Sequence, residues 1–106
     1  MTAMADIRAD IDRLDRDLVA LLARRAACID RAVAAKRAEG LPARIDARVD
    51  EVIANVRARA AAEGLDPDLV GEIWTRLIDW SIAREERAFA ADRAATPDRR
   101  ASEGRP

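Results

Sequence analysis

The chain has 106 residues, enough for one domain, with 37% charged residues, 3% aromatic residues and a formal net charge of -1. Its 19 basic and 20 acidic residues are interspersed, which argues against electrostatic binding to nucleic acid or to a membrane surface. One cysteine and no histidine exclude an internal disulfide, a Cys/His zinc site and catalysis by a Ser-His or Cys-His pair.

Composition and hydropathy favour a helical protein of the cytoplasm. Half of the residues are hydrophobic, but many of these are alanine, and the abundance of Ala, Arg, Leu, Glu and Asp favours helix over sheet. A chain with so few bulky core residues is marginally stable alone, which favours an oligomer. No run of about 18 apolar residues and no signal peptide occurs, so we expect a cytoplasmic protein without a membrane partner.

The first predicted helix covers residues 6–39 and is the longest element. Apolar or small residues recur at alternating intervals of four and three from Ile7 to Ala32. We expect Asp6 to cap the helix, after a frayed start, and the Gly-Leu-Pro stretch at 40–42 to end it. At 1.5 Å per residue such a helix is roughly 50 Å long. A compact chain of this size has a radius of gyration of only about 13 Å. A second copy of the chain is therefore expected to cover the helix.

Two shorter helices are predicted over residues 44–63 and 66–94. Gly64 closes the first of them, and the second begins with an N-cap acid, Asp66, followed by Pro67 at the first helical position. Both show apolar residues at helical spacing. The apolar faces consist of Ile45, Val49, Val52, Ile53 and Val56 in the first helix and of Val70, Trp74 and Leu77 in the second.

We expect a single helical domain over residues 6–95. Residues 96–106 contain no bulky apolar side chain and are predicted to be a disordered tail. The chain shows no strand signal and no internal repeat. The predicted fold class is therefore all-α, a three-helix chain with a long first helix that forms an intertwined homodimer.

Polar residues occupy or border apolar positions on all three predicted helices. They are Arg8, Arg25, Lys36, Arg48, Ser81 and Glu85. Arg25 and Lys36 are eleven residues apart, which places them within about 20° of the same azimuth on an apolar face. Two unpaired cations there would be costly, so carboxylates or an anionic ligand are expected to meet them. A pocket with three or four cations and one acid, Glu85, suits a small dianion.

Arg8 and Arg25 are seventeen residues apart, or roughly 25 Å along a helix axis. They therefore cannot grip one small molecule from the same helix. If two long helices lie antiparallel, Arg8 of one chain can approach Arg25 of the other. That arrangement would form two equivalent composite sites in a dimer.

Each of these residues taken alone also fits an ordinary structural role. Arginine and lysine at the edge of an apolar face often bury only their stems, and a serine such as Ser81 often serves as a small packing residue. Glu85 has Arg84 and Arg87 nearby as partners for surface ion pairs. Only the joint pattern indicates a site, and periodicity alone supports no more than an anion-binding helical dimer.

Two segments resemble a known family. The segment ADIRADIDRLDRDLVALLARR is similar to the first helix of the all-helical chorismate mutases (chorismate mutase type II): an Arg, then Ile-Asp-x-Leu-Asp, then Leu-Leu-x-Arg-Arg. Lys36 falls where the family has its first-helix lysine. EGLDPDLVGEIWTRLIDWSIAREE is similar to the third helix, with Ser81 and Glu85 in matching positions. The resemblance covers about residues 6–89 and includes the isochorismate pyruvate lyase branch.

The resemblance implies an intertwined dimer of three-helix chains whose long first helices pack together. It also implies that Arg25 and the partner's Arg8 bind the two carboxylates of the substrate. Arg48 would assist at a carboxylate, and Ser81 would lie near one. The implied substrate is a small dianion, chorismate or isochorismate.

The implied reaction is the Claisen rearrangement of chorismate to prephenate, which supplies phenylalanine and tyrosine biosynthesis. Lys36 and Glu85 would donate hydrogen bonds to the ether oxygen of the breaking C–O bond, and Arg25 would hold the reacting side chain. The reaction requires no metal and no cofactor, and none is expected. A glutamate donor must carry a proton, which predicts activity that falls as the pH rises.

Two positions depart from the typical mutase. The family's hydroxyl-binding glutamate on the second helix would fall at Val49 and a nearby aspartate at Ile45, both apolar here. The lyase branch also lacks that glutamate and carries a tryptophan in the segment where this chain has IDWSIA. Isochorismate pyruvate lyase, giving salicylate and pyruvate, is therefore an alternative. A further alternative is a non-catalytic helical dimer that binds a dianion or an enzyme partner.

Overall fold

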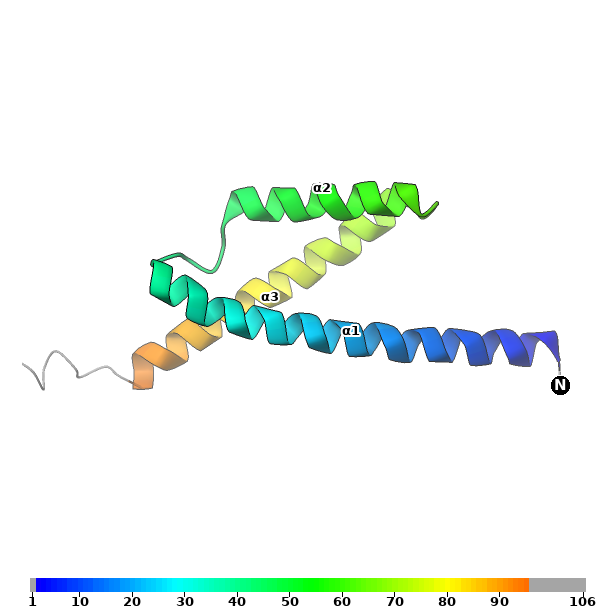
Figure 1. The fold of residues 1–106 in the computed structure, drawn as a ribbon, viewed down its shortest axis with the longest axis horizontal. Coiled ribbons are helices and arrows are strands. Elements are labelled where there is room, and N and C mark those ends of the chain that lie inside the picture. The colour runs from blue at the N-terminus through cyan, green and yellow to red at the C-terminus, as the bar shows by residue number, and fades with distance from the viewer. Residues whose placement is uncertain (1, 96–106) are drawn as a thin grey trace, which may run out of the picture.

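Three helices make up the protein. The computed structural model describes residues 2–95, and the predicted disorder of residues 96–106 lies outside them. The helices are α1 (Ala3–Glu39), α2 (Asp46–Ala62) and α3 (Pro67–Ala95), with no strand among the described residues (Figure 1). The predicted all-helical fold class is thereby confirmed.

The molecule is elongated because α1 extends far beyond the other two helices (Figure 1). Its principal extents are 78 × 32 × 16 Å and its radius of gyration is 19.9 Å. A compact chain of about 100 residues would have a radius of gyration of about 13 Å. The expectation that α1 outgrows a single globule is confirmed, and an extended first helix is what an intertwined dimer requires.

Helix α1 begins earlier than the sequence suggested, and Asp6 does not cap it. The cap is Thr2, whose backbone is extended and whose side-chain oxygen accepts a hydrogen bond from the Ala5 N–H at 3.0 Å. Alanine and methionine at positions 3–5 are strong helix formers, so the helix continues back to the first side chain able to cap it. Asp6 instead lies in the first turn, where its negative charge suits the positive end of the helix dipole.

The predicted helix ends are close to the observed ones because their signals are local. Gly40 takes a left-handed backbone conformation with a φ of 70°, and the Leu41 N–H then donates to the Lys36 carbonyl at 2.8 Å. Gly64 closes the region after α2 in the same way, with a φ of 72°. Asp66 accepts the Asp68 N–H at 2.9 Å, as expected of an N-cap.

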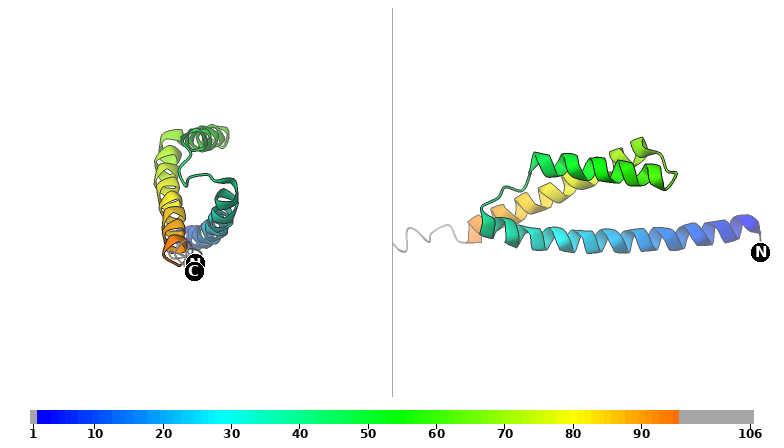
Figure 2. Two further views of the ribbon diagram at one scale, coloured as in Figure 1. Left: turned by 90° about the vertical axis from the view of Figure 1, so that its left-hand side faces the viewer. Right: turned by 45° about the horizontal axis from the view of Figure 1, so that its top comes forward.

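Helix α3 is the element that α1 and α2 share. It packs against both of them, while α1 and α2 remain apart from each other (Figures 1 and 2). The small core consists of Ala43, Ile78 and Ile82, with Val49, Val52, Ile53, Trp74 and Phe89 packed around it. The core therefore lies where the α1–α2 connection meets α3, and the cavity described below adjoins it.

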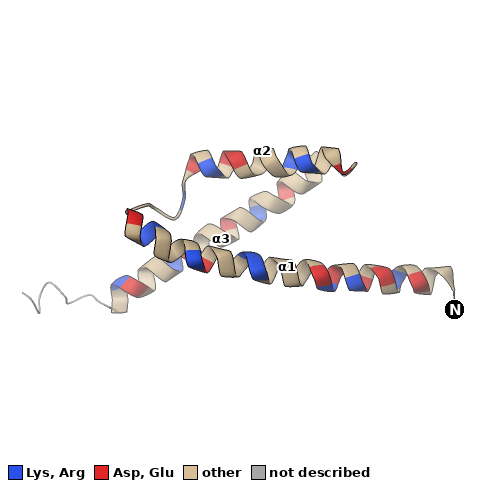
Figure 3. Cartoon of the chain, in the orientation of Figure 1, with Lys and Arg blue, Asp and Glu red and all other residues tan. Residues whose placement is uncertain are grey.

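Charged residues of both signs alternate along all three helices (Figure 3). This distribution agrees with the interspersed charges of the sequence. Within the described residues, no helix combines the length and the apolar character that crossing a membrane requires.

Candidate functional site

A cavity of about 270 Å³ lies where the three helices and the α1–α2 connection converge. Its polar lining residues are Arg25, Lys36, Arg48, Ser81 and Glu85. Its apolar lining residues are Ile29, Ala32, Ala43, Ile45, Val49, Val52, Ile78 and Ile82. The fold thus brings five of the six polar residues singled out from the sequence, together with Val49, to one cavity. Arg8 does not line it.

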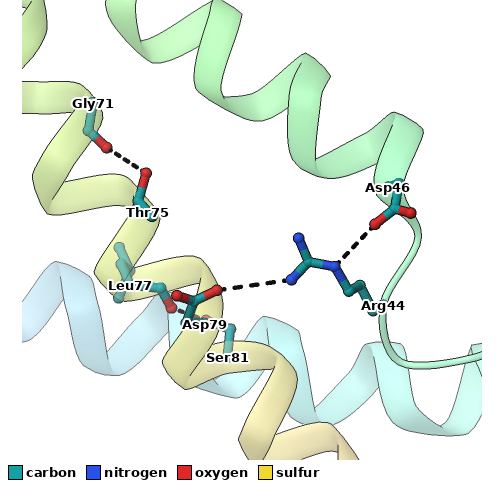
Figure 4. A network of polar contacts seen from close by, with 7 residues as sticks. All are labelled: Arg44, Asp46, Gly71, Thr75, Leu77, Asp79 and Ser81. Carbon is teal, nitrogen blue, oxygen red and sulfur yellow. Dashed lines mark hydrogen bonds and ion pairs between the residues drawn. The ribbon is translucent and has the colours of Figure 1, made fainter.

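Arg25 is held on the α3 side of the cavity by Ser81. Its Nη1 donates to Ser81 Oγ at 2.8 Å, and that hydroxyl donates to the Leu77 carbonyl at 2.8 Å (Figure 4). Ser81 is 3% exposed, so the hydroxyl is a fixed acceptor. Burial lowers the pKa of the Arg25 guanidinium, and the positive charge of Arg48 lowers it further. An anion in the cavity would relieve both unfavourable effects.

Lys36 and Glu85 form a second polar group in the cavity. Glu85 is 3% exposed, and its Oε2 lies 2.7 Å from Lys36 Nζ. That distance is typical of an ion pair, but Oε2 is buried and makes no hydrogen bond within the described part of the chain. Lys36 Nζ also donates to the Ala43 carbonyl at 2.6 Å. The cavity therefore contains a carboxyl oxygen with unused capacity for a hydrogen bond.

Arg48 reaches the cavity from α2, and its side chain is 63% exposed. It forms an ion pair with Glu51, one turn further along the same helix. An exposed pair of this kind is weak, and an anionic ligand can compete for the guanidinium. Arg48 is therefore placed at the rim of the cavity, whereas Arg25 is half-buried.

The side of the cavity formed by the start of α2 is apolar. Ile45 and Val49 both line it, at the two positions where the resemblance described above led us to expect acidic residues. A hydroxyl group that met this wall would lose its hydrogen bonds to water without replacement. The two positions at which the sequence departs from the expected pattern, Ile45 and Val49, therefore lie in the wall of the cavity.

The sequence reasoning missed Ala43 and gave no role in the site to Ile29 or to Ala32, the last residue of the predicted stripe, although both line the cavity. Ala43 lies in the connection between helices, where no periodic pattern marks a residue as facing a site. Ala43 contributes its backbone carbonyl, which accepts a hydrogen bond from Lys36. Every residue has such a carbonyl, so the type of residue does not indicate which carbonyl belongs to a site. Ile29 and Ala32 follow the same helical rhythm as the predicted stripe and could have been found from it.

The family model for chorismate mutase type II matches residues 7–86 of this chain. This chain belongs to that family. Members of the family are enzymes, either mutases or lyases. The match includes α2, most of α1 and α3, and every polar residue of the cavity.

Two curated relatives show how the type II chain occurs in other proteins. The chain is 37% identical to the isochorismate pyruvate lyase of Pseudomonas aeruginosa over 98 residues, covering 89% of this chain and 92% of the relative. It is 31% identical to the T-protein of Haemophilus influenzae over 87 residues, covering 82% of this chain. It spans only 23% of the T-protein's length. Family membership alone therefore leaves the reaction open.

Proposed function

We propose that this type II chain is a dimeric chorismate mutase that rearranges chorismate to prephenate. The observation that carries the proposal is the pairing of two polar groups in one cavity: Arg25 with Ser81, and Lys36 with Glu85. Ser81 and Glu85 are buried, and Arg25 and Lys36 are half-buried, so solvent screens the charges less than it would at the surface. The remaining walls are apolar, as a ring-shaped substrate with two carboxylates requires.

The two polar groups have different roles in the rearrangement. Arg25 and Arg48 bind carboxylates of the substrate, since a guanidinium matches a carboxylate with two parallel hydrogen bonds. This grip holds the enolpyruvyl side chain over the ring, where one C–C bond forms as the ether C–O bond breaks. No atom leaves the substrate, and no nucleophile takes part.

Negative charge develops on the ether oxygen as the C–O bond breaks. Lys36 donates a hydrogen bond to that oxygen, and Glu85 donates another when it carries a proton. The ammonium of Lys36 also lies 2.7 Å from Oε2 of Glu85, so both groups can reach the same atom of a substrate.

A second copy of the chain completes the proposed site. The first half of α1 projects from the other helices (Figure 1), and Arg8 belongs to its second turn, next to the exposed apolar side chains of Ile7 and Ile11. An antiparallel partner would cover these apolar side chains and bring the partner's Arg8 to the cavity of the first chain. The third guanidinium would then neutralise the second carboxylate.

Subunit complementation tests the composite site. Arg8→Ala and Arg25→Ala are each expected to abolish most turnover of chorismate. After the two variants are unfolded and refolded together, a mixed dimer contains one intact site and one site that lacks both arginines. With equal mixing, about a quarter of the wild-type sites should return. The Arg8 assignment fails if activity does not return although mixed dimers form.

A second candidate function is isochorismate pyruvate lyase, favoured by the apolar wall at Ile45 and Val49 and by similarity to a relative of that name. In this reaction the ether C–O bond breaks while a ring hydrogen moves to the methylene carbon of the leaving enolpyruvyl group. The products are salicylate and pyruvate. The same cationic grip would serve both reactions.

Product analysis separates the candidates. Purified protein is given chorismate and, separately, isochorismate at pH 5 and at pH 8. Prephenate from chorismate, formed faster at pH 5, supports the mutase. Salicylate and pyruvate from isochorismate, with little turnover of chorismate, replace it with the lyase. Turnover of neither substrate leaves a helical dimer that binds a dianion or an enzyme partner.

A further inference from the structure

Lys36 is the single lysine of the chain, beside 18 arginines. Every other basic side chain is a planar guanidinium. An ammonium differs because its three N–H groups point in three tetrahedral directions from one atom. A site that requires donation to three separate acceptors at one point therefore suits a lysine and not an arginine.

The two groups that contact the Lys36 ammonium belong to different elements of the fold. Lys36 Nζ donates to the Ala43 carbonyl of the α1–α2 connection at 2.6 Å and lies 2.7 Å from Glu85 Oε2 of α3. The side chain of Lys36 is 19% exposed and lines the cavity. The ammonium therefore makes one hydrogen bond, to Ala43, and one ion pair, with Glu85, and it retains N–H capacity for a ligand.

The carbonyl of Ala43 is itself held in place. The Ala43 side chain is 7% exposed and packs in the core with Ile78 and Ile82 of α3. The next residue, Arg44, contacts Asp46 at 2.9 Å and Asp79 at 3.8 Å (Figure 4). The packing of Ala43 therefore joins the connection to α3, and the exposed ion pair between Arg44 and Asp79 adds a second, weaker contact between them.

We propose that Ala43 is a positioning residue: its backbone carbonyl holds the Lys36 ammonium so that one N–H faces the cavity. The small side chain of Ala43 sets the distance between the connection and α3, and a larger one would push the carbonyl away from Nζ. What the free N–H donates to rests on the proposed function. The anchoring of Lys36 does not, because it exists in the free protein.

The anchoring is tested in the free protein by NMR with ¹⁵N-labelled lysine, because a single lysine gives a single side-chain ammonium signal. We expect Ala43→Val to speed the exchange of the ammonium protons with water by about tenfold or more, the scale of one lost hydrogen bond to a charged group. The matched control is Ala60→Val, a buried alanine of α2 that does not line the cavity. Both variants should lose stability, but only Ala43→Val should change the signal.

Unchanged exchange in a folded Ala43→Val protein overturns the proposal. Circular dichroism checks the fold, and Ala43→Gly replaces the variant if it does not fold. The glycine variant keeps the carbonyl but frees the connection, so the same acceleration is expected. The same result for Ala60→Val would mean that general loosening, and not the carbonyl, governs the signal.

Kinetics then connect the anchor to turnover. Ala43→Val should lower kcat by about tenfold with little change in KM, since the lost donor acts on charge that develops in the reaction. In a Lys36→Met background the same substitution should have no further effect. An equal loss in both backgrounds would indicate a merely structural role. Absence of turnover in the wild type would refute the proposed function and leave the NMR result standing.

Discussion

The two halves of α1 share one sequence rhythm but have different surroundings. Residues 3–24 are all exposed, whereas the second half contains the buried Val33 and the half-buried Arg25 and Lys36. Helix α3 packs against α1, and the buried and half-buried residues are confined to this second half. The difference shows that a periodic apolar stripe predicts that a face will be covered, but not which element covers it.

The uncovered half of α1 exposes large apolar side chains to water, which is energetically unfavourable. Leu14 and Leu18 are 61% and 57% exposed. Burying one such side chain fully is worth about 1.5–3 kcal/mol. The large apolar side chains left exposed on this half are Met4, Ile7, Ile11, Leu14, Leu18, Val19, Leu21 and Leu22. A helix that projects alone gains no such packing, and helix propensity by itself is marginal. The proposed partner chain would supply the missing contacts.

The largest expected effect comes from a charge on the uncovered stripe. Leu18→Glu should convert the proposed dimer to monomers and abolish turnover, because a carboxylate would be buried without a partner between two helices. Analytical ultracentrifugation measures the mass. Ala20→Glu adds the same charge two residues on, on the opposite side of α1. It should remain dimeric, and a Leu18→Glu dimer would contradict the proposed role of the stripe.

The next largest effect tests the covered half. Arg25→Ala should reduce transition-state binding by at least about 2 kcal/mol, the scale of a hydrogen bond between charged groups, as measured by kcat/KM. Its neighbour Arg24 is exposed and does not line the cavity. Arg24→Ala is therefore the matched control and should be close to wild type. An unchanged kcat/KM for Arg25→Ala would remove this residue from the site.

A smaller effect concerns the pH profile of the buried pair. The wild type should lose activity as the pH rises, because Glu85 donates to the ether oxygen only in its protonated form. Glu85→Gln donates at every pH and should flatten this alkaline fall. Steady-state rates across pH 5–8 provide the measurement. A profile that keeps its alkaline fall after the substitution would refute the donor role of Glu85.

The smallest effect concerns the surface contact that joins α1 to α3. Arg84 donates to both carboxylate oxygens of Asp30, at 2.7 and 3.0 Å, and this hydrogen bonding lowers the pKa of Asp30. A lowered pKa stabilises the folded state above the ordinary value of about 3.9, and this stabilisation disappears as the pH falls through the folded value. Asp30→Asn should therefore lower the free energy of unfolding slightly at pH 7.

The difference between Asp30→Asn and wild type should shrink as the pH falls below about 4. Urea unfolding at pH 7 and at pH 3 measures it. Asp12→Asn provides the control, since Asp12 is exposed on α1 and forms no ion pair with any described residue. A difference that grows in acid would contradict the stated role of the Asp30 carboxylate.

Local signals allowed much of the fold to be predicted from the sequence. Helices end or start at Gly40, Gly64 and Asp66 through hydrogen bonds within a few residues, so these signals can be recognised from the neighbouring sequence. The predicted start of α1 was wrong because two local signals compete there. Thr2 and Asp6 can each cap a helix, and the helix-forming residues between them decide in favour of Thr2.

The sequence by itself determined the helices, their apolar faces and which faces carry cations, because these depend on spacing along one chain. Only the tertiary structure decided that Lys36 meets both Glu85 and the Ala43 carbonyl, and that Arg25 meets Ser81. Such contacts join residues of different elements, and their distances depend on how α3 crosses its neighbours. A backbone carbonyl is common to every residue, so no sequence pattern can distinguish the one that holds the lysine.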